Sequence, residues 1–189
     1  MLLRTKLFGT TYEFPDLRVL MGKANEEKSG DRLAGLAADS AAERAAARFV
    51  LAELPLSAFR DEPAWPYEKD EVTRVILDGL NETIYREISG WTVGALREWI
   101  LDYDTDGDEL ARVSKGLSSE MIAAVTKLMS NLDLVYAASK MRVVRHSSNT
   151  IGLPGTLSNR LQPNHPTDSP EGIKASLFEG LSYGCGDAV

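Results

Sequence analysis

The chain has 189 residues, of which 43% are hydrophobic and 26% are charged, a balance that allows a folded core. Its 28 acidic and 21 basic side chains give a formal net charge of −7, which argues against a nucleic-acid-binding protein. The single cysteine, Cys185, leaves no intrachain disulfide and favours a reducing cytosol. No apolar run approaches the roughly 18 residues of a membrane-spanning helix, so we expect no contact with a membrane.

The N-terminal residues predict a short hairpin followed by two short helices. Residues 3–14 alternate weakly in polarity around Gly9, which is typical of two strands joined by a tight turn. Asp16 stands where it can cap a helix that runs to about residue 25. A second short helix is predicted over residues 31–38.

Longer helices are predicted between residues 40 and 140. Ser40 begins a capping-box pattern and opens an alanine-rich helix that ends before Pro55. Apolar residues at helical spacing then indicate single helices over residues 67–88 and from about 118 to 135, with a shorter helix over 92–103 between them. The two apolar stripes consist of Val72, Val75, Ile76, Leu80 and Ile84, and of Met121, Val125, Leu128, Leu132 and Val135.

The residue composition changes after about residue 150, where glycine, proline and asparagine surround a short apolar–polar run. A short strand is predicted within GTLSNRLQPN, a helix from Pro170 to Gly184, and the start of a second strand at residues 187–189. Strand, helix and strand in this order form the repeating unit of a parallel α/β sheet or barrel. Because a lone parallel strand has no partners for its edges, we expect further strands downstream.

The predicted fold class is therefore mostly α, with two domains. Residues 1–150 form an N-terminal helical domain that carries a short hairpin. Residues 151–189 form the first strand, the first helix and the start of the second strand of an incomplete TIM (β/α)8 barrel.

Arg160 and Gln162 are the candidate substrate-binding residues. They stand two residues apart and so point to one face of the predicted strand, while Leu161 points to the other. Polar residues near the C-terminal end of a barrel strand lie at the mouth where active sites form. A guanidinium and an amide are suited to orienting a small polar substrate rather than to proton transfer. The spacing alone fits equally well an arginine that ties the strand to an acidic neighbour.

No catalytic residue and no metal ligand is predicted. The acidic loop over residues 102–108 matches the first half of a calcium-binding EF-hand loop, but Val113 stands where the bidentate glutamate is required. We therefore interpret it as a solvated connection between two helices. His146, His165 and Cys185 are far apart in the sequence and do not form a zinc-binding pattern.

Several long motifs, in the same order, resemble the large (heavy) subunit of ethanolamine ammonia-lyase. They include NTIGLPGTLSNRLQPN, EGLSYGCGDAV, DEVTRVILDGLNETIYREISGWTVGALREWIL and KGLSSEMIAAVTKLMSNLDLVYAASKM. The resemblance extends over nearly the whole chain and is far more specific than a match to one short motif.

This resemblance implies an adenosylcobalamin-dependent lyase that converts ethanolamine to acetaldehyde and ammonia by a radical rearrangement. It implies that Arg160 and Gln162 match the substrate-contacting residues of the first barrel strand. It also implies assembly with a small (light) subunit and with other large subunits. The implied location is the bacterial cytoplasm, either free or inside an ethanolamine-utilisation microcompartment.

The chain departs from the family in its extent. The family's large subunit is more than twice as long, so most of the barrel and most cobalamin contacts fall outside these 189 residues. We therefore expect the isolated chain to be inactive. The alternative interpretation is a helical assembly module that contributes subunit contacts and has no catalytic activity of its own.

Overall fold

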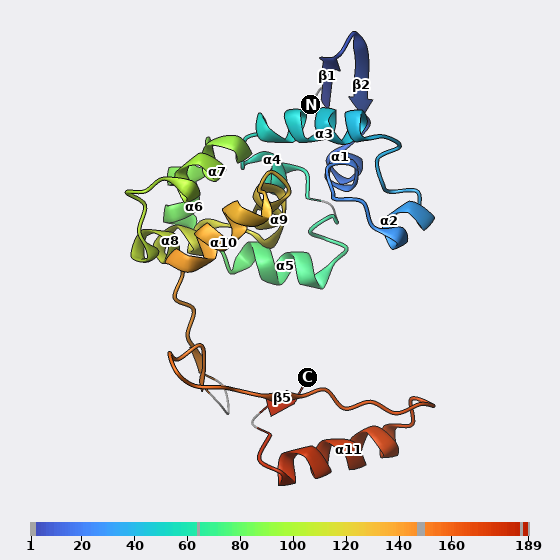
Figure 1. Ribbon diagram of the computed structural model, residues 1–189, viewed down its shortest axis with the longest axis vertical. Coiled ribbons are helices and arrows are strands. Elements are labelled where there is room, and N and C mark those ends of the chain that lie inside the picture. The colour runs from blue at the N-terminus through green and yellow to red at the C-terminus, as the bar shows by residue number, and fades with distance from the viewer. Residues whose placement is uncertain (1–2, 64, 147–149, 186, 189) are drawn as a thin grey trace. The chain divides into compact units, whose positions relative to one another are not determined.

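The computed structural model describes residues 3–63, 65–146, 150–185 and 187–188 (Figure 1). The chain divides into two compact units, Met1–Met141 and Arg142–Val189, and each is described by itself. Helices dominate both the first unit and the described residues as a whole, which confirms the predicted mostly α class. Within the described part of the chain, no helix is both long and apolar enough to cross a membrane.

The first unit opens with the predicted hairpin. Strand β1 (Leu3–Leu7) pairs antiparallel with β2 (Thr10–Phe14), and a two-residue loop of Phe8 and Gly9 joins them. Both loop residues have positive φ, 49° and 83°, as the tightest class of hairpin turn requires, and glycine adopts such a φ without strain. The far ends of the two strands are buried in the core of the unit.

Helix α3 (Ala41–Ala52) lies beside the hairpin and contributes four buried residues to this core (Figure 1). The Ser40 side chain caps it by accepting a hydrogen bond from the Glu43 backbone N at 3.1 Å. The Glu43 carboxylate accepts instead from the backbone N of Asp39 at 2.6 Å, so only half of the predicted capping box forms. Two adjacent alanines of α3, Ala46 and Ala47, are fully buried, and this allows neighbouring elements to approach closely.

The remaining elements of the first unit are short helices, and most but not all of them begin at a capping side chain. They are α1 (Leu17–Lys23), α2 (Ser29–Leu33), α4 (Ala58–Asp61), α5 (Glu71–Asp78), α6 (Glu82–Ile88), α7 (Val93–Leu101), α8 (Gly107–Val113), η1 (Ser114–Gly116), α9 (Ser119–Lys127) and α10 (Asn131–Lys140). The predicted caps Asp16, Thr92 and Ser118 each accept the expected backbone hydrogen bond. The helix predicted over residues 31–38 lies instead at Ser29–Leu33.

The single helix predicted over residues 67–88 is wrong, because α5 and α6 are separate. The Asn81 side chain caps α6 by accepting from the Ile84 backbone N at 3.1 Å. Its own backbone N donates to the Lys115 carbonyl at 2.8 Å, a contact with a distant turn that replaces a helical hydrogen bond. The predicted apolar stripe is broken as well, since the side chains of Val72 and Val75 are largely exposed.

The single helix predicted from about residue 118 to 135 is also wrong. Ser130 starts α10 with a complete capping box, in which its side chain and that of Asp133 each bond the other's backbone N. Because the helix is interrupted, the predicted stripe does not face the core along its whole length. Met121 of α9 is buried, whereas Leu132 and Val135 of α10 are 77% and 66% exposed.

The second unit contains the predicted order of strand, helix and strand. Strand β5 (Arg160–Leu161) pairs in parallel with β6 (Asp187–Ala188), and helix α11 (Pro170–Ser182) lies between them in the sequence. A second pair, β3 (Arg145–His146) and β4 (Thr150–Ile151), is antiparallel. A single unit of this type occurs in open sheets as well as in barrels, so closure into a barrel stays a prediction.

Candidate substrate-binding strand

Strand β5 is positioned by its contacts with α11. Leu161 is half-buried and packs against Gly180, the buried residue of α11, where an added Cβ would overlap the leucine side chain. A glycine at this position therefore sets how closely the helix approaches the strand. This contact fixes which face of the strand is covered.

The start of α11 is also tightly defined. The Ser169 side chain accepts a hydrogen bond from the Gly172 backbone N at 3.4 Å, and Pro170 takes the first helical position, where its missing N–H costs nothing. The imidazole of His165 lies against Gly172, so closely that a Cβ there would overlap the ring. Its Nδ1 lies 3.3 Å from the donating backbone N of Thr167. His165 therefore packs the turn before the helix.

Arg160 and Gln162 have exposed side chains, and the residue between them is turned toward α11. This is the alternation expected of a strand with one covered and one open face. The β6 residue in register with Arg160 is Asp187. The exposure of Arg160 fits both a substrate contact and a tie to an acidic neighbour, so both interpretations stay open.

The other reactive side chains have local roles. His146 Nδ1 lies 2.9 Å from the Thr150 hydroxyl across the β3–β4 pair. Cys185 is a half-buried free thiol whose backbone N donates to the Gly180 carbonyl at 3.3 Å. Among the residues that the structure describes, no group of three or more His, Cys, Asp or Glu side chains is arranged to hold a metal ion.

The acidic loop is a connection between helices, as predicted. The Asp102 side chain accepts from the backbone N of Asp104 at 2.9 Å. Asp106 caps α8 by accepting from the backbone N of both Asp108 and Glu109 at 2.9 Å. These carboxylates are used to turn the chain from α7 into α8.

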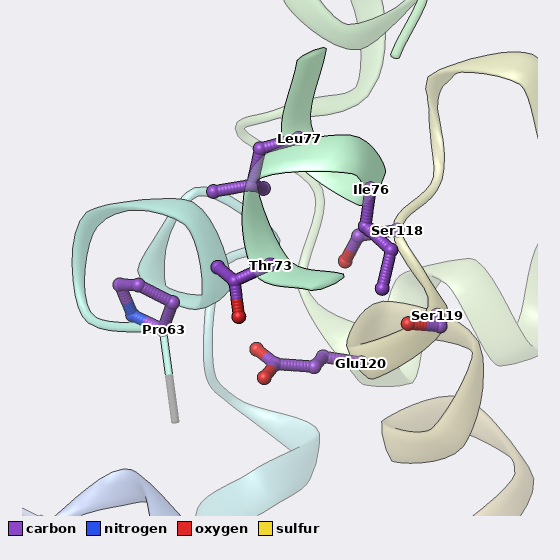
Figure 2. Close-up of a pocket in the computed structure, with 7 residues that line it drawn as sticks. All are labelled: Pro63, Thr73, Ile76, Leu77, Ser118, Ser119 and Glu120. Carbon is purple, nitrogen blue, oxygen red and sulfur yellow. The ribbon is translucent and has the colours of Figure 1, made fainter. Parts of the chain in front are cut away.

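A small cavity lies between α5 and the start of α9 (Figure 2). Its volume is about 40 Å³, which is enough for about one water molecule and too small for an organic substrate. Thr73 and Glu120 face the hollow from opposite sides, as Figure 2 shows. We interpret it as a packing gap rather than as a functional site.

The described elements define a mostly helical protein with a parallel strand–helix–strand unit, in which the exposed Arg160 lies in the first strand and the exposed Gln162 follows it. The family model described as "Ethanolamine ammonia lyase large subunit (EutB)" matches residues 12–189, and the chain belongs to this family. The resemblance read from the sequence is thereby confirmed.

Curated relatives match the chain along its whole length. It is 50% identical over 189 residues to the ethanolamine ammonia-lyase large subunit of Escherichia coli strain K12. It is 49% identical over the same length to that of Salmonella typhimurium strain LT2. In each case the match covers 100% of this chain and 42% of the relative, and it falls in the relative's N-terminal part.

Proposed function

We propose that this chain supplies the helical domain and the first barrel strand of an ethanolamine ammonia-lyase that depends on adenosylcobalamin. The observation that carries the proposal is the pair of exposed side chains, Arg160 in β5 and Gln162 directly after it, on either side of Leu161, which packs against α11. Support also comes from the 50% identity to a large subunit of that name. The proposed partners are a small subunit and other large subunits, and the proposed location is the bacterial cytoplasm or a microcompartment within it.

The proposed domain division is a helical domain over residues 1–150 and a barrel segment over residues 151–189. In a (β/α)8 barrel the strands are parallel and each is followed by a helix, which is the order of β5, α11 and β6. The relatives are more than twice as long as the match. We infer that the other strands of the barrel correspond to the rest of their length.

The chemistry of Arg160 and Gln162 suggests how they would hold ethanolamine. A guanidinium only donates hydrogen bonds and is always positively charged, so it attracts the substrate hydroxyl oxygen and repels the ammonium group. The Gln162 amide has both a donor and an acceptor and can bond either polar group. Together they would orient the substrate with its hydroxyl toward Arg160, and neither would transfer a proton.

The described residues do not by themselves form a cobalamin site. A cleft of about 700 Å³ in the first unit is lined largely by charged and polar side chains, which do not suit the broad apolar face of a corrin ring. The His165 Nδ1 is engaged by Thr167, and the ring packs on α11. We therefore assign the cofactor, which supplies the radical, to the complete enzyme and derive no step through it from this chain.

The test uses the holoenzyme assembled from the complete large subunit and the small subunit. Replacing Arg160 by Met removes charge-assisted hydrogen bonds, each worth about 1.5–3 kcal/mol, and should lower kcat/KM for ethanolamine by about 10- to 100-fold. The matched control is Arg4→Met, on the exposed hairpin. Equal activity of the Arg160 variant and the control would contradict a substrate contact.

A second candidate function, a subunit-contact module, is supported by the surface of the first unit. Leu132 and Val135 of α10 are largely exposed. An apolar groove of about 350 Å³ lies between α7, α9 and α10 and is lined by side chains that include Trp99 and Met129. Exposed apolar surface of this kind marks protein–protein contacts.

This candidate is tested by charge substitution on α10. The double change Leu132→Asp and Val135→Asp should release the small subunit or other large subunits during size-exclusion chromatography of the co-expressed enzyme. Leu33→Asp, at an exposed apolar residue of α2, is the control. Retention of the full assembly by the α10 double variant would exclude this surface as a subunit contact.

A further inference from the structure

A polar cleft of about 700 Å³ opens in the first unit where three segments distant in sequence converge. Lys28 comes from the loop before α2, Arg48 from α3 and Lys127 from the last turn of α9. The carboxylate among its lining residues is that of Glu26. This gathering of cations is unexpected in a chain whose formal net charge is −7.

The positive charge in this cleft is only partly compensated. Arg48 pairs with Glu26 at 2.6 Å and also donates through Nε to the Ala24 carbonyl at 3.0 Å. Lys127 donates to the Asn25 side chain, a neutral acceptor. Among the described residues, no ion pair within 4.0 Å joins a carboxylate to Lys28 or Lys127.

The lowered pKa of Lys127 indicates that its charged form is unfavourable in this cleft. Burial lowers the pKa of its ammonium group, and the nearby charges of Lys28 and Arg48 lower it further. Asp31 opposes this effect from behind Asn25, whose amide donates to the Asp31 carboxylate at 3.4 Å. A half-buried ammonium held beside two other cations is stabilised by an anion placed among them.

We propose that this cleft binds the phosphate group of a small organic molecule, with Lys28, Arg48 and Lys127 holding its oxygens. The lining residues carry three cations and one carboxylate, and a dianion matches this positive surplus better than a single carboxylate does. Ammonium and guanidinium groups are the usual donors to phosphate. Ser130 and Asn131 at the start of α10 also line the cleft and add polar side chains to it. Met129 and Leu134 supply an apolar wall for the organic part.

This site is independent of the proposed ammonia-lyase function, because it uses no residue of the second unit. It is tested on the 189-residue chain by isothermal titration calorimetry with inorganic phosphate and with phenyl phosphate at constant ionic strength. We expect saturable binding of one phenyl phosphate per chain, at least threefold tighter than inorganic phosphate. No saturable binding of either probe would overturn the proposal, and equal affinity would assign the cleft to free phosphate and overturn the organic-ligand part.

Matched variants identify the residues responsible. Lys127→Met should weaken phenyl phosphate binding by at least tenfold, whereas Lys115→Met, which removes the same charge from the exposed turn η1, should change it less than twofold. Circular dichroism verifies that each variant folds. If Lys127→Met does not fold, the exposed Lys28→Met serves in its place, with a loss of at least threefold expected. Equal effects of the cleft variant and the Lys115 control would overturn the assignment.

Discussion

Arg97 on α7 and Asp133 on α10 form an ion pair at 2.8 Å between residues 36 positions apart in the sequence. The same Asp133 carboxylate accepts a hydrogen bond from the Ser130 backbone N at 2.9 Å and so completes the capping box of α10. One side chain therefore both starts a helix and attaches it to its neighbour. The interruption between α9 and α10 is thus coupled to the packing of α10 on the core.

The stability of the first unit should fall in acid because of Asp133. The Ser130 amide, and secondarily Arg97, lower the pKa of this carboxyl below its ordinary value of 3.8. The stabilisation is therefore present above the unfolded pKa and is lost as pH falls through the lower folded pKa. Asp133→Asn should reduce stability at pH 7 and flatten its decline below pH 4, measured by urea unfolding. A decline as steep as that of the unchanged chain, or of the control Asp108→Asn, would contradict this role.

The contact between Leu161 and Gly180 predicts a size limit in the second unit. Alanine ordinarily favours a helix over glycine by up to about 1 kcal/mol. At Gly180 the added methyl group would overlap Leu161, and overpacking costs about 1–3 kcal/mol, so we expect net destabilisation. Hydrogen exchange of α11 amides measures the effect, with Gly30→Ala in open space as the control. The double change Gly180→Ala and Leu161→Ala should restore protection, and its failure would refute the steric cause.

The cap at Asn81 should contribute measurably to stability. Asn81→Ala removes the acceptor for the Ile84 backbone N and should lower the free energy of unfolding by about 1 kcal/mol. Ser57 precedes α4 without making a side-chain capping hydrogen bond, so Ser57→Ala should change stability far less. Thermal unfolding followed by circular dichroism compares the two variants. A larger loss at Ser57 would argue against capping as the cause.

Lys127 should be a position where binding and stability oppose each other. Because its pKa is lowered in the folded state, the charged form destabilises the fold, fully below the folded pKa and progressively less as pH rises toward the ordinary value of 10.5. Lys127→Met should therefore raise Tm at pH 7 without phosphate. The unchanged chain should gain Tm on adding phenyl phosphate, and the variant should not. A lower Tm of the variant without ligand would contradict this account.

Local signals in the sequence predicted those features that depend on a few neighbouring residues. The turn at Gly9 and the caps at Asp16, Thr92 and Ser118 were predictable because each needs only a residue type and its near neighbours. The break at Asn81 was not, because it is fixed by a hydrogen bond to the distant Lys115 carbonyl. The pattern Ser130–Asp133 was a capping signal within an apolar stripe, and the stripe concealed it.

The two candidate sites also differ in whether neighbouring residues in the sequence are enough to predict them. The alternation around Leu161 is local, so the open face of β5 could be predicted from the sequence. The cationic cleft could not, because Lys28, Arg48 and Lys127 come from three separate segments and only the fold brings them together. Net charge gave no hint of it, since the whole chain is acidic.

The two fully buried alanines of α3 have a consequence for how this family can vary. Ala46 and Ala47 are fully buried among neighbouring elements, so a much larger side chain there would have to displace packed atoms, and we expect volume to limit these positions more than polarity. Phe49, on the same helix, is 63% exposed and is free of that limit. We therefore expect relatives to carry only glycine, serine, cysteine or alanine at the first two positions and a wide range of residues at the third.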